Sequence, residues 1–226
     1  MTDQLRLDLH VHSRFSPDSR LTLREIVGRL AYTGLRGFAL TDHNSVDGIP
    51  ELDRLARENP AYLLVPGVEV SAREGHLLAY GLRELPPVHR PIHETIDWVV
   101  GHGGVPVPAH PFRIGHGVGG KVAAEVKAPA LEVRNGHTSG IANAKAELLA
   151  ARRGLGGTGG SDVHTIDDLG RSFTEFSTEV ENVDDVVDSI LHGRSSGAGD
   201  SPRWARRLRL GARTALLRAG RGFRPI

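Results

Sequence analysis

Short apolar runs alternate along the chain with segments in which apolar residues recur at helical spacing, and this alternation predicts parallel βα units. The runs expected as strands are residues 5–11, 37–40, 62–70, 76–82, 105–107, 130–133 and 173–176. The segments expected as helices are residues 22–32, 49–58, 92–100, 141–153 and 183–191. Thr22 and Glu25 have the spacing of a capping box at the start of the first helix. The pattern therefore predicts an α/β fold with about seven strands.

The composition changes toward the C-terminal end of the chain. Residues 193–202 are rich in Gly, Ser and Asp, which is typical of a linker. Residues 202–226 contain eight arginines and no acid, so this tail carries +8 while residues 1–201 carry −7, although the whole chain is at +1. We therefore predict a single domain over residues 1–195, followed by a linker and an Arg-rich tail over residues 196–226.

The residue types limit the chemistry. The chain has no cysteine, which excludes disulfides, a thiolate nucleophile, iron–sulfur clusters and thiolate zinc sites. Any metal must therefore be held by nitrogen and oxygen, and twelve histidines are present. The first residues lack a basic segment followed by a long apolar core, and no window approaches the roughly 18 apolar residues of a membrane span. We expect a cytoplasmic protein.

Five polar motifs stand where apolar runs end. They are Asp8-Leu-His10-Val-His12, Thr41-Asp42-His43, Gly67-Val-Glu69, Pro108-Ala-His110-Pro111 and Gly159-Gly-Ser-Asp162-Val-His164. Each motif alone is also compatible with a solvated strand end or loop. Because the carboxyl ends of parallel strands meet at one rim, all five would bring their carboxylates and imidazoles together there, at a cost in repulsion and desolvation. Divalent cations remove that cost, so the set predicts a metal site.

The expected ligands also indicate a chemistry. Imidazole and carboxylate without sulfur suit zinc, manganese or iron(II), and the sequence does not rank these metals. A bridging carboxylate places two ions about 3.5–4 Å apart, close enough to share a water and lower its pKa toward neutrality. Phosphoryl transfer requires mainly such positioning and charge stabilisation.

In this order and at these separations, the motifs resemble those of the PHP (polymerase and histidinol phosphatase) metallohydrolases, over about residues 5–195. The resemblance implies a distorted (β/α)7 barrel with a centre of three divalent metal ions that hydrolyses phosphate esters. It also implies that His10 and His12 bind the first metal, that Asp162 completes this site, and that Glu69 bridges to the second metal, which His110 also binds.

The same resemblance implies that Asp18, His43 and His164 bind the third metal. His137 is the candidate for a further ligand of the second metal, with a polar loop position as the alternative. The remaining histidines match no motif and are expected at the surface; they are His89, His93, His102, His116 and His192.

Further residues are candidates for contacts around the metals. Arg113 and Arg134 are expected to bind phosphate, with a solvated surface position as the alternative for both. The resemblance also implies that His76 lies near the site, where it either contacts a metal ligand or faces the substrate. Asp8 and Asp42 are adjacent to the expected ligands, and we expect them to orient imidazoles.

Two functions follow from these observations. The first is a metal-dependent phosphoesterase acting on a small phosphorylated substrate, for which histidinol phosphate, a nucleoside 3′,5′-bisphosphate and an oligonucleotide end are the candidates. The second is a noncatalytic, metal-stabilised module that binds nucleic acid or acidic membrane through residues 202–226. A tail that is solvated or folded onto its own acidic domain is the alternative to such a partner.

Overall fold

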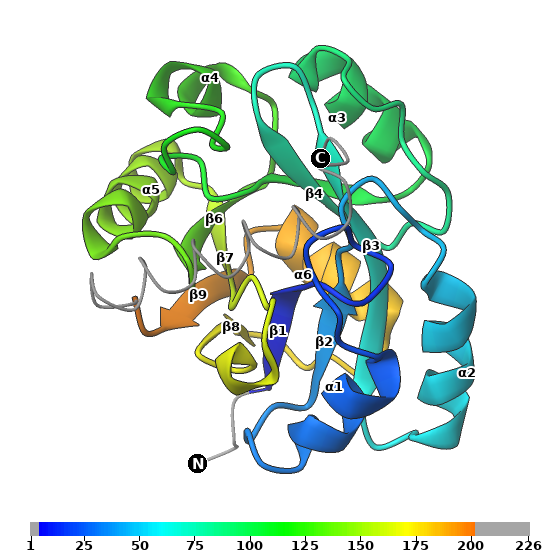
Figure 1. Cartoon of the computed structure of the whole chain (residues 1–226). Coiled ribbons are helices and arrows are strands. Elements are labelled where there is room, and N and C mark those ends of the chain that lie inside the picture. Colours follow the sequence, from blue (N-terminus) through cyan, green and yellow to red (C-terminus); the bar gives the residue numbers. More distant parts are fainter. Residues whose placement is uncertain (1–4, 202–226) are drawn as a thin grey trace.

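The computed structural model describes residues 5–201, which form a curled sheet surrounded by helices (Figure 1). The strands are β1 (Arg6–Val11), β2 (Gly37–Leu40), β3 (Leu63–Ser71), β4 (His76–Tyr80), β5 (Val105–Pro108), β6 (Ala130–Asn135), β7 (Gly156–Gly160), β8 (Ser172–Phe176) and β9 (Ser195–Gly199). The helices are α1 (Leu23–Leu30), α2 (Ile49–Glu58), α3 (Ile92–Gly101), α4 (Gly120–Glu125), α5 (Gly140–Arg153) and α6 (Val183–Leu191).

The strands form a distorted barrel, as expected. One sheet has the order β5-β4-β3-β2-β1-β8-β9, and β6 pairs with β7 separately. The first three strands are parallel, whereas β4 runs antiparallel to both of its neighbours. The β6–β7 pair closes the barrel, because β6 packs against β5 and the residue Val163 after β7 forms a parallel bridge with Val11 of β1.

One apolar cluster lies toward the amino ends of the strands. Leu63, Val105 and Ala130 lie at the beginnings of β3, β5 and β6, and they belong to the same cluster as Val186 and Ile190 of α6. Helix α6 therefore packs against the amino end of the barrel. The opposite end, where the parallel strands finish, is left for polar side chains.

Local signals predicted the helices well. The capping box is present, since Thr22 accepts the backbone N–H of Glu25 and the Glu25 side chain accepts the backbone N–H of Thr22. The short helix α4 was not expected. Within residues 5–201 no helix has the length and apolar character needed to cross a membrane.

Two strands correct the expectation of about seven. Residues 156–160 form β7, although their glycines predict only a turn. A Cβ atom on Gly160 would lie 2.3 Å from Cβ of His10, and one on Gly159 would lie 2.3 Å from the carbonyl oxygen of Phe173. Neighbouring strands therefore approach too closely for side chains here, and a strand without apolar side chains leaves no hydrophobic pattern.

The predicted linker is corrected in the same way. Residues 195–199 form β9, which pairs antiparallel with β8, and the backbone N–H of Asp200 donates to the carbonyl of Arg171. The boundary predicted between residues 195 and 196 thus lies inside a strand, and the folded part continues to at least residue 200. The Arg-rich tail over 202–226 lies outside the described residues.

Candidate metal centre

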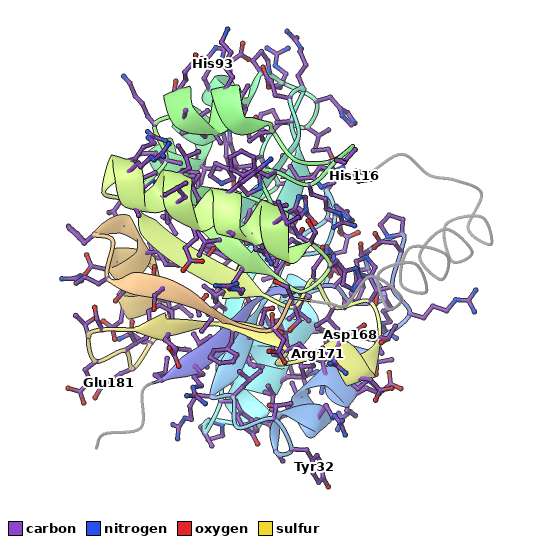
Figure 2. The ribbon with its side chains drawn as sticks, turned by 90° about the vertical axis from the view of Figure 1, so that its left-hand side faces the viewer. Tyr32, His93, His116, Asp168, Arg171 and Glu181 are labelled. Carbon is purple, nitrogen blue, oxygen red and sulfur yellow. The ribbon has the colours of Figure 1, made fainter. Side chains whose placement is uncertain are left out.

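The nine predicted metal ligands are all buried, with at most 9% of any residue exposed. Most of them lie near the ends of strands or shortly after strands, at the carboxyl end of the barrel. They are His10, His12, Asp18, His43, Glu69, His110, His137, Asp162 and His164. Figure 2 agrees with this placement. Asp168, whose carboxylate lies near His137, is on one side of the molecule, and Glu181, just before α6, is on the other.

Glu69 lies at the centre of the cluster, near the end of β3. Its Oε2 atom is 3.0 Å from Nε2 of His10, 3.2 Å from Nε2 of His12 and 3.2 Å from Nδ1 of His43. Its Oε1 atom is 2.8 Å from Nδ1 of His76 and 3.1 Å from Nε2 of His110. One carboxylate therefore faces five imidazoles, with both oxygens in use, which is the arrangement a bridging ligand requires.

Two further carboxylates extend the cluster on either side. Oδ1 of Asp162 lies 3.3 Å from Nε2 of His12 and 3.5 Å from Nδ1 of His164. Oδ2 of Asp18 lies 3.0 Å from Nε2 of His164 and 3.3 Å from Nε2 of His43. Asp18 comes from the loop between β1 and α1, so residues from separate loops converge on shared imidazoles.

The backbone is strained where two of these residues project. His110 has φ of 30° and Asp162 has φ of 56°, in the left-handed region that residues with a side chain rarely adopt. Such conformations cost about 1–3 kcal/mol each and persist where the surrounding structure fixes them. At His110 the backbone N–H donates to Oε2 of Glu132 at 2.7 Å, which fixes the loop after β5.

The carboxylates of the cluster are ionised. Burial alone would raise the pKa of Glu69, but the imidazoles of His43, His10 and His76 hold it well below its usual value. The pKa values of Asp162 and Asp18 are likewise held well below the usual range by neighbouring imidazoles, against the effect of burial. All three side chains therefore offer negative oxygens to a cation at neutral pH.

The imidazoles divide into two kinds. Burial lowers the pKa of His43 to about 4 and also lowers the pKa of His110, so both rings are neutral and carry a free lone pair. Burial alone would lower the pKa of His12, but the carboxylates of Asp162 and Glu69 raise it to about 10. In the metal-free protein His12 is thus an imidazolium that balances the carboxylates.

These residues fit divalent cations. Several buried imidazole nitrogens have no hydrogen-bond partner, among them Nε2 of His12, Nδ1 of His43 and Nε2 of His164. Five overlapping groups of three residues have ligand atoms within 4.8 Å of one another, and together they include His76 and all the predicted ligands except His137. Ionised oxygens and imidazole nitrogens without hydrogen-bond partners in one buried cluster are the donors that zinc, manganese and iron(II) accept.

His137 lies beside the cluster. Its ring stacks on that of His164 with 5.0 Å between centroids, and its Nε2 atom is 3.9 Å from Oδ2 of Asp168. Among the described residues it belongs to none of the groups of ligand atoms. Its role as a ligand of the second metal therefore stays a prediction.

Sequence reasoning missed two residues on β6. Glu132 accepts a hydrogen bond from Nδ1 of His10 at 2.8 Å, and Asn135 donates to both Glu132 oxygens and to Oδ2 of Asp162 at 3.3 Å. Glu132 thereby orients His10 from the side opposite Glu69. A buried acid within the apolar run Ala130–Asn135 is a signal that could have pointed to it.

The two candidate phosphate ligands have different positions. Nη1 of Arg113 donates to Oδ2 of Asp162 at 2.7 Å, so this guanidinium reaches the cluster. Arg134 does not, because its Nη2 donates to Glu147 on α5. The pairing register of β6 shifts between Glu132 and Arg134, and this bulge turns Asn135 inward and Arg134 outward, which corrects the predicted phosphate contact of Arg134.

Asp8 and Asp42 bind backbone rather than imidazoles, which corrects their predicted role. Asp8 accepts the backbone N–H groups of His10, Ser161 and Gly170. Asp42 accepts the backbone N–H and the hydroxyl of Ser13. Both carboxylates thus fix the loops that carry the expected ligands.

A narrow cleft with a free volume of about 10 Å³ opens above the cluster. It is lined by Asp18, His43, Glu69, His76, His110, Arg113, His116, Asp162 and His164. His116 was expected at the surface, but its ring lies 5.3 Å from that of His76 and it is only partly exposed, which corrects that expectation. His89, His93, His102 and His192 are exposed, as expected.

Comparison with known proteins gives two family matches. The model of the PHP domain matches residues 8–105, and a PHP-associated model matches residues 140–195. An uncharacterized protein of Methanocaldococcus jannaschii is 28% identical over 151 residues, which are 62% of this chain and 87% of that protein.

Two solved structures have a similar fold. A two-domain protein from Bacteroides vulgatus containing a predicted PHP-like metal-dependent phosphoesterase matches with a TM-score of 0.73 at 19% identity, over 87% of this chain and 65% of that protein. A lesion-specific endonuclease from Pyrococcus furiosus matches with a TM-score of 0.64 at 18% identity, over 88% of this chain and 60% of that protein. This chain thus spans less than two thirds of either protein.

Proposed function

This chain belongs to the PHP family, and on that premise we propose that it is a metal-dependent phosphoesterase that hydrolyses its substrate in the cleft above Glu69. The observation that carries the proposal is the convergence of three ionised carboxylates on seven buried histidines, several of whose nitrogens lack a partner. A cluster of this kind is costly without cations, and the cleft opens it to solvent.

The donors would hold three divalent cations in overlapping sets. The first set is His10, His12 and Asp162, the second is His110 with His137, and the third is Asp18, His43 and His164, while Glu69 is shared between the first two. Bound divalent cations supply a water of lowered pKa and offset the negative charge of a phosphate. Zinc, manganese and iron(II) all suit this set of nitrogen and oxygen donors.

Residues around the cleft position the substrate. The guanidinium of Arg113 is 27% exposed and lies against Asp162, so it can exchange this carboxylate for a phosphate oxygen, which it would bind with the same fork of donors. His76 and His116 line the same cleft and would hold the remaining phosphate oxygens. The buried walls exclude bulk water, which strengthens each of these contacts.

The test is a panel of substrates. Protein loaded with Mn²⁺, Zn²⁺ or Fe²⁺ should hydrolyse p-nitrophenyl phosphate and at least one of histidinol phosphate, a nucleoside 3′,5′-bisphosphate and a 5′-phosphorylated oligonucleotide. An Asp162→Asn variant should lose at least 100-fold in rate, because the amide replaces an ionised ligand oxygen. The exposed neighbour Asp167 provides the control Asp167→Asn, which should keep the rate. A loaded protein that turns over none of these esters would contradict the proposal.

The noncatalytic alternative has less support. A module that uses metals only for stability would not need a cleft, nor an arginine placed against a ligand carboxylate. The donor set is complete at every position that the family resemblance implies, with His137 the one member outside the tight cluster. Both features favour hydrolysis.

A further inference from the structure

The described chain ends at the rim of the metal-ligand cluster. The hydroxyl of Ser201 accepts a hydrogen bond from Nδ2 of Asn143 at 2.9 Å, at the start of α5. The same amide group donates to the carbonyl of Asn135, and the Asn135 side chain donates in turn to Asp162. Two asparagines therefore separate the last described residue from a predicted metal ligand.

Hydrogen bonds of Asp200 also hold this end of the described chain. The backbone N–H of Asp200 donates to the carbonyl of Arg171, and its carbonyl accepts from the hydroxyl of Ser172 at 3.1 Å. Arg171 lies next to Asp168 on the side of the molecule that carries the cluster (Figure 2). Ser201, the last described residue, is therefore held close to residues that contact the cluster.

The composition of residues 202–226 is typical of a segment that binds polyanions. These residues contain eight arginines and no acid, whereas residues 1–201 carry a charge of −7. Arginine binds phosphate oxygens with a planar fork of donors, and it is favoured where phosphates are recognised. A segment of 25 residues can extend over at most about 80 Å, far beyond the width of the cleft.

The cleft is too small to enclose a long substrate. Its free volume of about 10 Å³ is room for about one water molecule. Any further phosphates of a longer substrate would lie outside the cleft. Membrane binding is less well matched, because Gly211, Gly220 and Gly222 interrupt the amphipathic helix it would need.

We propose that residues 202–226 are an arginine arm that binds the phosphate backbone of a single-stranded nucleic acid and holds the end of that strand in the cleft. This inference rests on the proposed phosphoesterase function and narrows its substrate class. A small phosphomonoester would react without the arm, whereas a nucleic-acid strand would depend on it.

The experiment compares three forms of the Mn²⁺-loaded protein: the full chain, a chain ending at Ser201, and a chain in which the eight arginines are changed to Gln. A matched chain with the same eight positions changed to Lys keeps the charge. These positions are Arg203, Arg206, Arg207, Arg209, Arg213, Arg218, Arg221 and Arg224. Binding to a phosphorothioate single-stranded DNA 20-mer is measured by fluorescence anisotropy from 50 to 200 mM KCl, and hydrolysis of p-nitrophenyl phosphate is measured on the same preparations.

We expect the truncated and Gln forms to bind the 20-mer at least about 100-fold more weakly at 50 mM KCl, and the Lys form to bind nearly as well as the full chain. If all eight arginines pair with phosphates, the slope of log K against log salt should become shallower by about 5 to 6 on truncation, at about 0.7 per contact. Hydrolysis of p-nitrophenyl phosphate should stay within about twofold in all forms.

Other results would overturn the inference. Equal affinity and salt slope in full and truncated chains would refute the arm, and so would binding of the full chain to phosphatidylserine vesicles but not to the 20-mer. A truncation that lowers thermal stability without changing DNA affinity would show that the tail covers its own domain instead. These results leave hydrolysis of p-nitrophenyl phosphate intact, whereas its absence in every form would refute the proposed phosphoesterase function.

Discussion

Replacing His43 by Ala tests whether the outer part of the cluster holds a cation of its own. Nε2 of His43 lies 3.3 Å from Oδ2 of Asp18, and its Nδ1 lies 3.2 Å from Oε2 of Glu69. The ring therefore connects the outer carboxylate with the central one. Because burial lowers the pKa of His43 to about 4, the ring is neutral at pH 7 and can bind a cation without first losing a proton.

The size of the effect follows from the number of ligands. The outer set has three side chains, Asp18, His43 and His164, so the variant loses one third of its protein ligands. Removing a group that merely hydrogen-bonds a ligand already costs about 10- to 100-fold in metal affinity. Removing a ligand should therefore cost at least 100-fold, or about 2.7 kcal/mol. The fold should survive, because His43 belongs to none of the apolar clusters of residues 5–201.

The assay is metal analysis of purified protein after dialysis, beside turnover of p-nitrophenyl phosphate and circular dichroism. His43→Ala should hold one metal equivalent fewer than the unaltered protein and lose most of its activity while keeping its spectrum. His93→Ala is the control, because His93 is exposed on α3 and should leave metal content and rate unchanged. Unchanged metal content in His43→Ala would remove Asp18, His43 and His164 as a metal site.

Three further predictions concern packing, orientation and pH. Gly160→Ala should lower the free energy of unfolding by about 3 kcal/mol or more, because the added Cβ would lie 2.3 Å from Cβ of His10. Gly28→Ala should instead raise the free energy of unfolding by about 0.5–1 kcal/mol, because its added Cβ meets nothing within 4 Å. Urea unfolding checks both variants. Glu132→Gln should weaken metal binding about 10- to 100-fold in a competitive chelator titration, and equal affinity would show that His10 needs no orienting partner. In the metal-free protein the pKa of His12 is raised to about 10, so its contribution to stability is complete below pH 6.5 and is lost as the pH rises. Urea unfolding should then show a loss of up to about 3 kcal/mol between pH 7 and pH 9, and a flat profile would contradict this reasoning.

The sequence predicted that the expected ligands would lie together because they stand at strand ends. His10, Glu69 and His110 come from three separate apolar runs, and parallel strands bring their carboxyl ends to one rim whatever the loops between them do. Strand alternation was also sufficient to place His10 and His12 together, and their ring centroids lie 5.0 Å apart.

Features set by contacts between distant segments could not be predicted in this way. Strand β7 has glycines because β1 and β8 approach its backbone, and only the three-dimensional arrangement shows that approach. The bulge in β6 exchanges the directions of Arg134 and Asn135, and simple alternation has no signal for it. The exposed fraction of His116 likewise depends on the fold of the loop after β5, which no periodic pattern describes.

Buried acids outside the ligand set explain how the cluster can form before any cation is bound. Burial raises the pKa of Asp8 and of Asp42 to about 6, which is a free-energy cost, and hydrogen bonds from backbone N–H groups partly offset it. Asp8 on β1 accepts the backbone N–H of Ser161, and Glu132 on β6 accepts the backbone N–H of His110. The hydrogen bond from Glu132 on β6 thereby fixes the left-handed conformation of His110. Asp162 comes directly after Ser161, whose backbone N–H is held by Asp8, and this bond restrains the left-handed conformation of Asp162. Because these bonds involve no cation, we expect the loops that carry the expected ligands to keep their positions when cations are removed by a chelator, so that the circular dichroism spectrum stays unchanged.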